Sequence, residues 1–191
     1  MKTYEAKIES ASPLIMSRML STKAGEGMKQ ERETHEDYDL RIWPIKAWAN
    51  TKGAVYIPRI FFKRSLEEAA QFLGLQIPGK GKSTYTKHFL AGVQIASDME
   101  LDITRDDLQC VPINCHADGK KGSGKRVVRH FPQVPEWSGV LTVLVVDELV
   151  TKDVLIKHFD TAGTMIGIGS FRPRSGNSSG MFKVLSLTEI G

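Results

Sequence analysis

The residues best suited to chemistry form a glycine-rich stretch near the end of the chain, at 163–183. It contains five glycines, Arg172 and Arg174 on either side of Pro173, and no acidic residue. Glycine lets a backbone approach a ligand closely and expose its N–H groups, and the arginine guanidinium matches the geometry of phosphate oxygens. The stretch is therefore suited to hold the phosphate backbone of a nucleic acid.

Two further glycine-containing segments, 78–88 and 118–130, are also basic. Together with 167–183 they hold eleven Lys or Arg and one acidic residue, although the net charge of the whole chain is only +4. The rest of the chain holds 15 basic and 21 acidic residues. This division predicts a polyanion site if the three loops converge, and solvated turns if they do not. The predicted nucleic-acid-binding residues are Lys80, Lys82, Lys87, Lys120, Lys121, Lys125, Arg126, Arg129, Phe171, Arg172 and Arg174.

Aromatic residues accompany these basic loops. Tyr85, Phe131 and Phe171 lie within or beside them and could stack on bases. Packing in the core or at its rim is the alternative interpretation for each of them. The run Gly-Lys-Gly-Lys-Ser-Thr at 79–84 is not a P-loop, because it follows a predicted helix and lacks the required spacing.

The catalytic candidates are few. His35, Asp37 and Asp39 lie in a segment of mixed charge and are of types that cut RNA or bind a metal ion. A charged, mobile loop is the other interpretation of this segment. Because no Ser/His/Asp set has persuasive spacing, we predict no catalytic residue and no cofactor.

The two cysteines, Cys110 and Cys115, do not predict a metal site. With His116 they match no common zinc-ligand spacing, and His130 would have to be recruited from elsewhere. We interpret them as reduced thiols in or near a strand, and we predict no bound metal.

Length and composition predict a single domain in the cytoplasm. The chain has 191 residues, of which 41% are hydrophobic and 25% charged. The first residues show no apolar segment of the kind found in a secretory signal. The longest apolar run, around 140–146, is too short to span a bilayer, and so we expect no membrane partner.

The periodicity of apolar residues predicts an α+β fold with the order βαββαβ, which is ferredoxin-like and includes the RNA-recognition fold. The domain is expected to span 1–191, with a long insertion at about 17–54 and a β-hairpin insertion at about 105–135. The long excursion at 20–38 is expected to be mobile. The expected strands lie at 2–10, 88–96, 99–104, 106–113, 126–131, 140–146 and 181–187, and the expected helices at 59–73 and after Thr151.

Three short segments of the chain resemble the RAMP superfamily, which includes the backbone subunits of CRISPR effector complexes. The first is Glu9-Ser-Ala-Ser-Pro-Leu14, at the end of the first strand. The second is Val55-Tyr-Ile-Pro58 followed by Lys63-Arg-Ser-Leu66, and the third is the glycine-rich loop 163–180. The chain also resembles small phage proteins that share its Ile-Pro-Gly-Lys-Gly and Ile-Gly-Ile-Gly segments.

The resemblance implies a modified RNA-recognition fold, binding of single-stranded RNA and head-to-tail self-assembly along the strand. The expected function is therefore non-catalytic binding of single-stranded nucleic acid, RNA rather than DNA, by a homo-oligomer. One alternative is an endoribonuclease of the same superfamily, dependent on metal or not, with Asp37 or Asp39 as the nearest match to the family's aspartate. The other is a phage factor that binds a host or phage protein and uses the fold as a scaffold.

Overall fold

The computed structural model describes residues 1–117 and 124–191, and these form two compact units. The first unit comprises Met1–Leu14, Tyr56–Leu101 and Pro135–Gly191. The second unit comprises Ile15–Val55 and Asp102–Val134, apart from 118–123. The expectation of a single domain with two insertions stays a prediction.

The first unit is built on a four-stranded antiparallel sheet in the order β4-β8-β1-β9. In β1, the residues Tyr4, Ala6 and Ile8 are buried at alternate positions, as a strand with one covered face requires. The strands predicted at 2–10, 140–146 and 181–187 are confirmed to within two residues. The four strands are β1 (Lys2–Ser10), β4 (Val93–Ile95), β8 (Ser138–Val145) and β9 (Phe182–Glu189).

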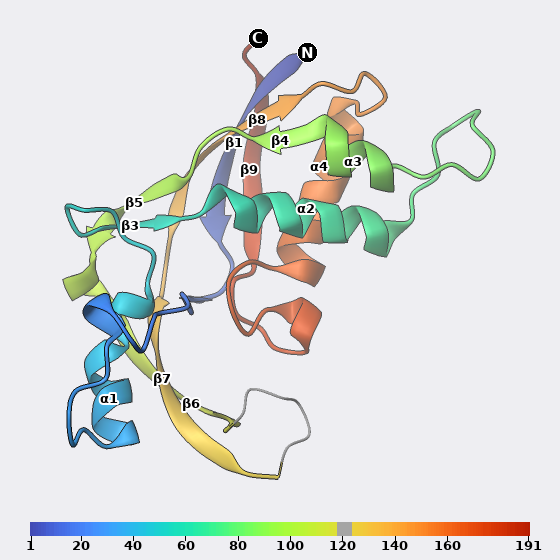
Figure 1. Ribbon diagram of the computed structural model, residues 1–191. Helices are drawn as coiled ribbons and strands as arrows, with labels where there is room; N and C mark the ends of the chain where they lie inside the picture. The colour runs from blue at the N-terminus through green and yellow to red at the C-terminus, as the bar shows by residue number, and fades with distance from the viewer. Residues whose placement is uncertain (118–123) are drawn as a thin grey trace. The chain divides into compact units, whose positions relative to one another are not determined.

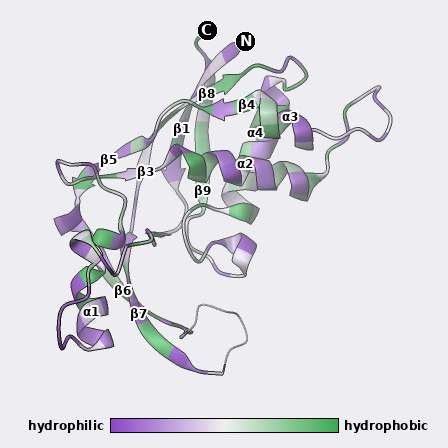
Figure 2. Ribbon diagram, in the orientation of Figure 1, coloured by the Kyte–Doolittle hydropathy of each residue, from purple (hydrophilic) through white to green (hydrophobic). Residues whose placement is uncertain are grey.

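Two helices pack on this sheet, and both are confirmed where the sequence predicts them. Helix α2 (Arg59–Leu73) ends at Gly74, whose φ of 53° lies in the left-handed region that favours glycine. Helix α4 (Lys152–Thr161) begins at Thr151, whose side chain accepts a hydrogen bond from the backbone of Val154. The two helices contact each other and the sheet (Figure 1). Figure 2 shows hydrophobic and hydrophilic bands alternating along α2, as expected for a helix with one buried face.

The expected strand at 88–96 is wrong over most of its length. Helix α3 (Thr86–Gly92) occupies it, and only β4 at its end is extended. The cause is a tertiary contact, since the buried ammonium of Lys63 donates to the backbone oxygens of Phe89 and Leu90 at the end of α3. Local periodicity cannot reveal such a contact.

The second unit contains the predicted hairpin. Strands β6 (Gln109–His116) and β7 (Arg126–Val134) pair antiparallel, and the short β2 (Leu14–Ile15) continues this sheet. Strands β3 (Ala54–Ile57) and β5 (Met99–Thr104) form a separate two-stranded sheet, and each runs from one unit into the other. Three 3₁₀ turns complete the unit, at Gly25–Gly27, Pro44–Lys46 and Arg105–Asp107.

The excursion predicted at 20–38 is irregular over most of its length, with a 3₁₀ turn at Gly25–Gly27, but helix α1 (His35–Ile42), which the sequence did not predict, begins at its end. Thr34 caps this helix by accepting a hydrogen bond from the backbone of Asp37, and its hydroxyl donates back to the Asp37 carboxylate. Only Tyr38, Asp39 and Ile42 of the helix are buried. Because one of these three buried residues is charged, the sequence shows no periodicity of apolar residues that would predict the helix.

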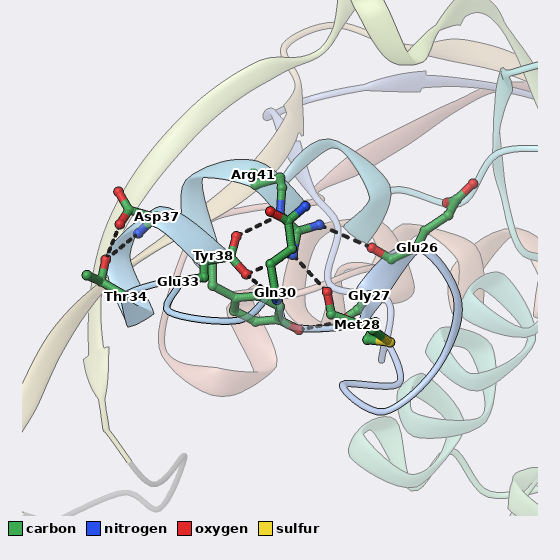
Figure 3. A network of polar contacts seen from close by, with 9 residues as sticks. All are labelled: Glu26, Gly27, Met28, Gln30, Glu33, Thr34, Asp37, Tyr38 and Arg41. Carbon is green, nitrogen blue, oxygen red and sulfur yellow. Dashed lines mark hydrogen bonds and ion pairs between the residues drawn. The ribbon is translucent and has the colours of Figure 1, made fainter.

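Arg41 holds the earlier part of the excursion onto this helix (Figure 3). Its Nε and Nη2 donate to the two carboxylate oxygens of Glu33 at 2.7 and 2.9 Å, and Nη2 also donates to the backbone of Met28. Tyr38 donates from its hydroxyl to the backbone of Gly27 at 2.8 Å. The hydrogen bonds from Arg41 lower the pKa of Glu33 to about 2. The excursion is thus an ordered part of the second unit.

No helix among the described residues is both long and apolar enough to cross a bilayer.

Candidate nucleic-acid interface

The glycine-rich loop follows α4 through a π turn (Ala162–Ile166) and is packed tightly against its own unit. A Cβ atom at Gly163 would lie 2.1 Å from the backbone oxygen of Phe182, and one at Gly180 would lie 1.9 Å from that of Ile168. The backbone N–H groups of Gly167 and Gly180 already donate within the protein. The idea that these glycines offer free N–H groups to a ligand is therefore corrected, because they allow the loop to pack on itself.

The arginines of this loop lie beside helix α2. Arg172 donates to Glu68 at 2.7 Å, and Arg174 approaches the other oxygen of the same carboxylate at 3.8 Å. The side chain of Arg174 is 56% exposed and that of Arg172 only 25% exposed. Phe171, before them, is half-buried and has a φ of 55°, which is rare for a bulky residue and marks a constrained backbone. Arg174 is thus the guanidinium better placed to reach a ligand.

The segment Ser12-Pro13, in the first stretch that resembles the RAMP family, contacts this loop directly. The backbone oxygen of Pro13 accepts hydrogen bonds from Gly180 and from the Ser179 hydroxyl. The Ser12 hydroxyl accepts from the backbone of Met181 at 2.9 Å. The contact of the Ser12 hydroxyl explains why a small polar residue stands there.

The second stretch that resembles the RAMP family makes buried hydrogen bonds within the first unit. Lys63 donates to three backbone oxygens, those of Phe89, Leu90 and Val93, at 2.6 to 2.9 Å, and pairs with Glu67 at 3.0 Å. Two residues on, the Ser65 hydroxyl donates to the backbone of Ala162 at the start of the π turn. The first segment thus contacts the end of the glycine-rich loop, and the second ties α2 to α3, β4 and the π turn.

The basic loop predicted at 78–88 belongs to the same unit and follows the end of α2, but its last residues, 86–88, form the start of α3 (Figure 1). Lys80, Lys82 and Lys87 are exposed, as a phosphate contact requires. Tyr85 is 5% exposed and packs edge-on against His158. Its proposed stacking on a base is therefore wrong, because the ring is inside the core.

The end of this loop is anchored by a second ionisable pair. His88 Nδ1 lies 2.5 Å from the Asp147 carboxylate, and this hydrogen bond lowers the pKa of Asp147, with a smaller contribution from the charge of Lys80. The close approach of Gly92 leaves no room for a Cβ beside Asp147. The lysines thus project from a loop with a fixed base.

In the second unit, the hairpin carries the remaining predicted basic residues. Lys125 and Arg126 are exposed, and Arg129 is half-buried. Lys120 and Lys121 lie outside the described residues. Phe131 is buried, with the ammonium of Lys46 5.0 Å from its ring centroid, and is not available to a base.

The hairpin and α1 together line a cavity of about 670 Å³. His35 and Glu36 from the first turn of α1 line it with Lys125, Arg129 and His130 from the hairpin. The structure thus brings together one predicted catalytic residue and two predicted nucleic-acid-binding residues. Two of these five groups, Lys125 and Arg129, are cationic, which suits a phosphate group.

Asp39 lies buried behind this cavity and is 2% exposed. It pairs with Lys46 at 2.6 Å and accepts hydrogen bonds from the backbone and the ring of His130. Burial alone would raise the pKa of Asp39, but the hydrogen bonds from Lys46 and His130 outweigh it, and the pKa is lowered. Asp39 therefore positions His130 rather than meeting a substrate itself.

Asp37 remains exposed, although its carboxylate serves the cap of α1. Sequence reasoning missed the parts of this site that come from far along the chain. Asp39 and His130 are 91 residues apart, and only the fold brings them together. Lys46 gave no signal, since a lone charged residue is ordinarily solvated.

The cysteines show no sign of a shared site. Cys110 is exposed and Cys115 half-buried, and burial raises the pKa of each thiol. Within the described ranges, no group of three or more His, Cys, Asp or Glu side chains is placed to hold a metal ion.

Comparisons with known proteins match the fold and not the sequence. No family model matches the chain, and no curated protein matches it. A chain in the cryo-EM structure of the type III-B Cmr-beta bound to cognate target RNA has a similar fold, with a TM-score of 0.54 and 16% identity. The match covers 99% of this chain but only 60% of that one.

The crystal structure of Cmr6 from Pyrococcus furiosus is also similar, with a TM-score of 0.47 and 12% identity, over 96% of this chain and 98% of Cmr6. The likeness to the Cmr-beta chain supports a mixed α/β fold shared with that chain, at low sequence identity.

Proposed function

We propose that this protein binds single-stranded RNA without cleaving it. The observation that carries the proposal is the likeness of the fold, over nearly the whole chain, to a chain of Cmr-beta bound to its target RNA. The order of elements in the first unit agrees with it. The antiparallel sheet β4-β8-β1-β9, with α2 after β1 and α4 after β8, supports the proposal of a ferredoxin-like core.

The loops, rather than the sheet, are the proposed contact with RNA. RNA-recognition domains stack bases on aromatic residues of the open sheet face. Here the two aromatic residues of the four strands, Tyr4 and Phe182, are both buried, and β1 presents Glu5, Lys7 and Glu9 on the other face. A sheet face of mixed charge without an exposed ring offers no platform for stacked bases, and so binding falls to the exposed lysines and arginines of the loops.

Matched pairs of substitutions test the proposal. Lys80→Gln/Lys82→Gln removes two exposed charges from the first unit, and Lys125→Gln/Arg126→Gln removes two from the second. We expect each pair to weaken binding of a labelled single-stranded RNA by about tenfold or more at low salt, measured by fluorescence anisotropy. The slope of log affinity against log salt should fall by about 1 to 1.5 for the two lost phosphate contacts.

The control pair is Lys152→Gln/Lys157→Gln on α4, which removes the same charge from exposed positions outside the loops. It should leave both the affinity and the salt slope nearly unchanged. Equal losses in all three variants would mean that only net charge matters, and the loops would lose their role. Negligible binding by the unchanged protein at low salt would refute the function itself.

Cleavage is tested in the same samples. We expect the RNA to stay intact with and without divalent metal. Product formation that stops with Asp37→Ala or His130→Ala would favour the nuclease alternative, and recovery of a protein partner that survives nuclease treatment would favour the scaffold alternative. An origin in a phage stays a prediction from the shared segments.

A further inference from the structure

A second cavity of about 740 Å³ lies within the second unit, away from the residues that sequence reasoning selected. The ordered excursion forms one wall and the turn at 49–53 another, and Arg105 reaches in from the 3₁₀ turn that follows β5. Its basic side chains are Arg18, Lys52 and Arg105, and Glu26 is its acidic one. The formal charge of the lining is therefore positive.

The three basic side chains of this cavity have hydrogen-bond donors that the described residues leave without a close partner. Arg105 is 25% exposed, and its ion pair with Glu26 is long, at 3.8 Å. The Nε–H of Arg105 is buried without a hydrogen-bond partner among the described residues. Within the same part of the chain, neither Arg18 nor Lys52 forms an ion pair. Buried arginine donors without partners are unusual, because they lose water and gain nothing in return.

The guanidinium of Arg18 is oriented by an aromatic ring. Its guanidinium lies 5.6 Å from the ring centroid of Trp48, a cation–π distance that favours a fixed orientation of the planar group. Its backbone N–H donates to Lys46 at 2.8 Å, which fixes the start of the wall. The side chain of Met19 next to it is 95% exposed and adds an apolar surface at the rim.

We propose that this cavity binds the phosphate group of a nucleotide, through Arg18, Lys52 and Arg105. Two guanidinium groups and an ammonium match a phosphate better than a single carboxylate, because forked donors pair with several of its oxygens. The volume far exceeds that of a phosphate alone and lies in the range of pockets for small organic ligands. The exposed Met19 offers a surface for the base or sugar.

Glu26 allows a test in which the loss of a charge should raise the affinity for phosphate. Its side chain is 68% exposed and faces Arg105, and so it competes with an incoming anion for the same guanidinium. The hydrogen bond that Arg41 makes near Glu26 uses the backbone oxygen and does not depend on the carboxylate. Glu26→Gln should therefore strengthen phosphate binding, whereas Arg105→Gln should weaken it.

The test measures binding of AMP and adenosine by calorimetry and by tryptophan fluorescence. AMP should bind and adenosine should not, and the fluorescence change on binding should disappear in Trp48→Phe. We expect Arg105→Gln and Lys52→Glu each to weaken AMP binding by about tenfold or more. Lys52 is exposed, so Lys52→Glu tests the site even if Arg105→Gln fails to fold.

The matched control is Lys23→Gln, an exposed lysine of the same excursion that does not line the cavity. It should change AMP affinity by less than about twofold, since an exposed charge outside the pocket is screened by salt. Glu26→Gln should raise the affinity. Equal binding of AMP and adenosine, or a loss of affinity in Glu26→Gln, would overturn the proposal.

The phosphate could come from a free nucleotide or from the end of a strand, and a second arm separates these sources. A single-stranded RNA with a 5′-phosphate is compared with the same RNA carrying a 5′-hydroxyl. A preference for the phosphate that disappears in Arg105→Gln identifies the strand end, and AMP binding without that preference identifies a free nucleotide. The absence of both overturns the proposal.

The strand-end source rests on the proposed RNA binding, and the two can fail separately. RNA binding that depends on Lys80 and Lys82 but ignores both AMP and the 5′-phosphate would leave the proposed function standing and remove this site alone.

Discussion

At the scale of single residues, the buried cluster around Asp39 shows how charge is used away from any ligand. Asp39 satisfies the ammonium of Lys46, the backbone N–H of His130 and the ring of His130. Lys46 in turn donates to the backbone oxygen of His130 at 2.8 Å, which ties the 3₁₀ turn Pro44–Lys46 to the hairpin. A buried pair of this kind adds little net stability over an apolar pair, but breaking one partner leaves the other charge uncompensated.

We therefore predict that Asp39→Ala and Lys46→Met each destabilise the second unit, and that their effects on stability are not additive. Each single change should lower the free energy of unfolding by about 3–5 kcal/mol, measured by urea titration. Asp39→Ala/Lys46→Met together should cost clearly less than the two added, because no charge is left buried alone. Additive losses would contradict this explanation of the cluster.

The same cluster predicts the direction of the acid response. The pKa of Asp39 is lowered in the fold from its ordinary value of 3.8. Its contribution to stability is therefore complete above that value and is lost as the pH falls through the lower, folded pKa. The unchanged protein should lose this part of its stability below about pH 4, and Asp39→Asn should lack it, since an amide does not titrate.

At the scale of elements, the glycine-rich loop can be tested by two positions that share a backbone conformation. Gly176 and Gly180 have φ values of 80° and 72°, so alanine is strained at both. A Cβ at Gly176 meets nothing within 4 Å, whereas one at Gly180 collides with the backbone of Ile168. Gly176→Ala should cost about 1 kcal/mol of stability, and Gly180→Ala about 1–3 kcal/mol more.

Urea unfolding measures this difference, and RNA affinity shows its consequence. Gly180→Ala should also weaken RNA binding, because it displaces the segment that carries Arg174, while Gly176→Ala should not. If both changes lower the affinity equally while Gly180→Ala costs clearly more stability, the glycines act on the ligand directly, and the packing explanation is wrong.

Elements with strong local signals could be predicted from the sequence, and those held by distant contacts could not. Strand β1 shows alternate burial, and α2 and α4 have an apolar face, a proline or threonine at the start, and breakers beyond. Helix α3 depends on Lys63, and the excursion depends on Arg41 and Tyr38. A single lysine or arginine gives no periodic signal, because its partner is decided by the fold.

The sequence predicted the chemical type of the candidate site but not the arrangement of its residues. The excess of Lys and Arg in Gly-containing loops pointed to exposed cations, and Lys80, Lys82, Lys125 and Arg126 are exposed. Composition could not show that Arg172 is already paired with Glu68. Nor could it show the second cavity, whose basic residues come from three distant parts of the chain.

At the scale of the whole molecule, the remaining prediction concerns assembly. Because contacts with phosphate are independent of sequence, one copy that binds a strand leaves the neighbouring phosphates as equivalent sites for further copies. We therefore predict that several copies bind along one RNA. Mass photometry with a short single strand, and with strands of two and four times its length, should show the number of bound copies rising in proportion to length.

The same measurement distinguishes assembly driven by RNA from assembly of the protein alone. Without RNA the mass should correspond to fewer copies than on the longest strand, and Lys80→Gln/Lys82→Gln should reduce the occupancy of every length in parallel with its loss of affinity. A single copy on all three strands would mean that the protein recognises one feature, such as an end. In that case the phosphate cavity lined by Arg18, Lys52 and Arg105, rather than the lysine loops, would be the first place to look for the determinant of binding.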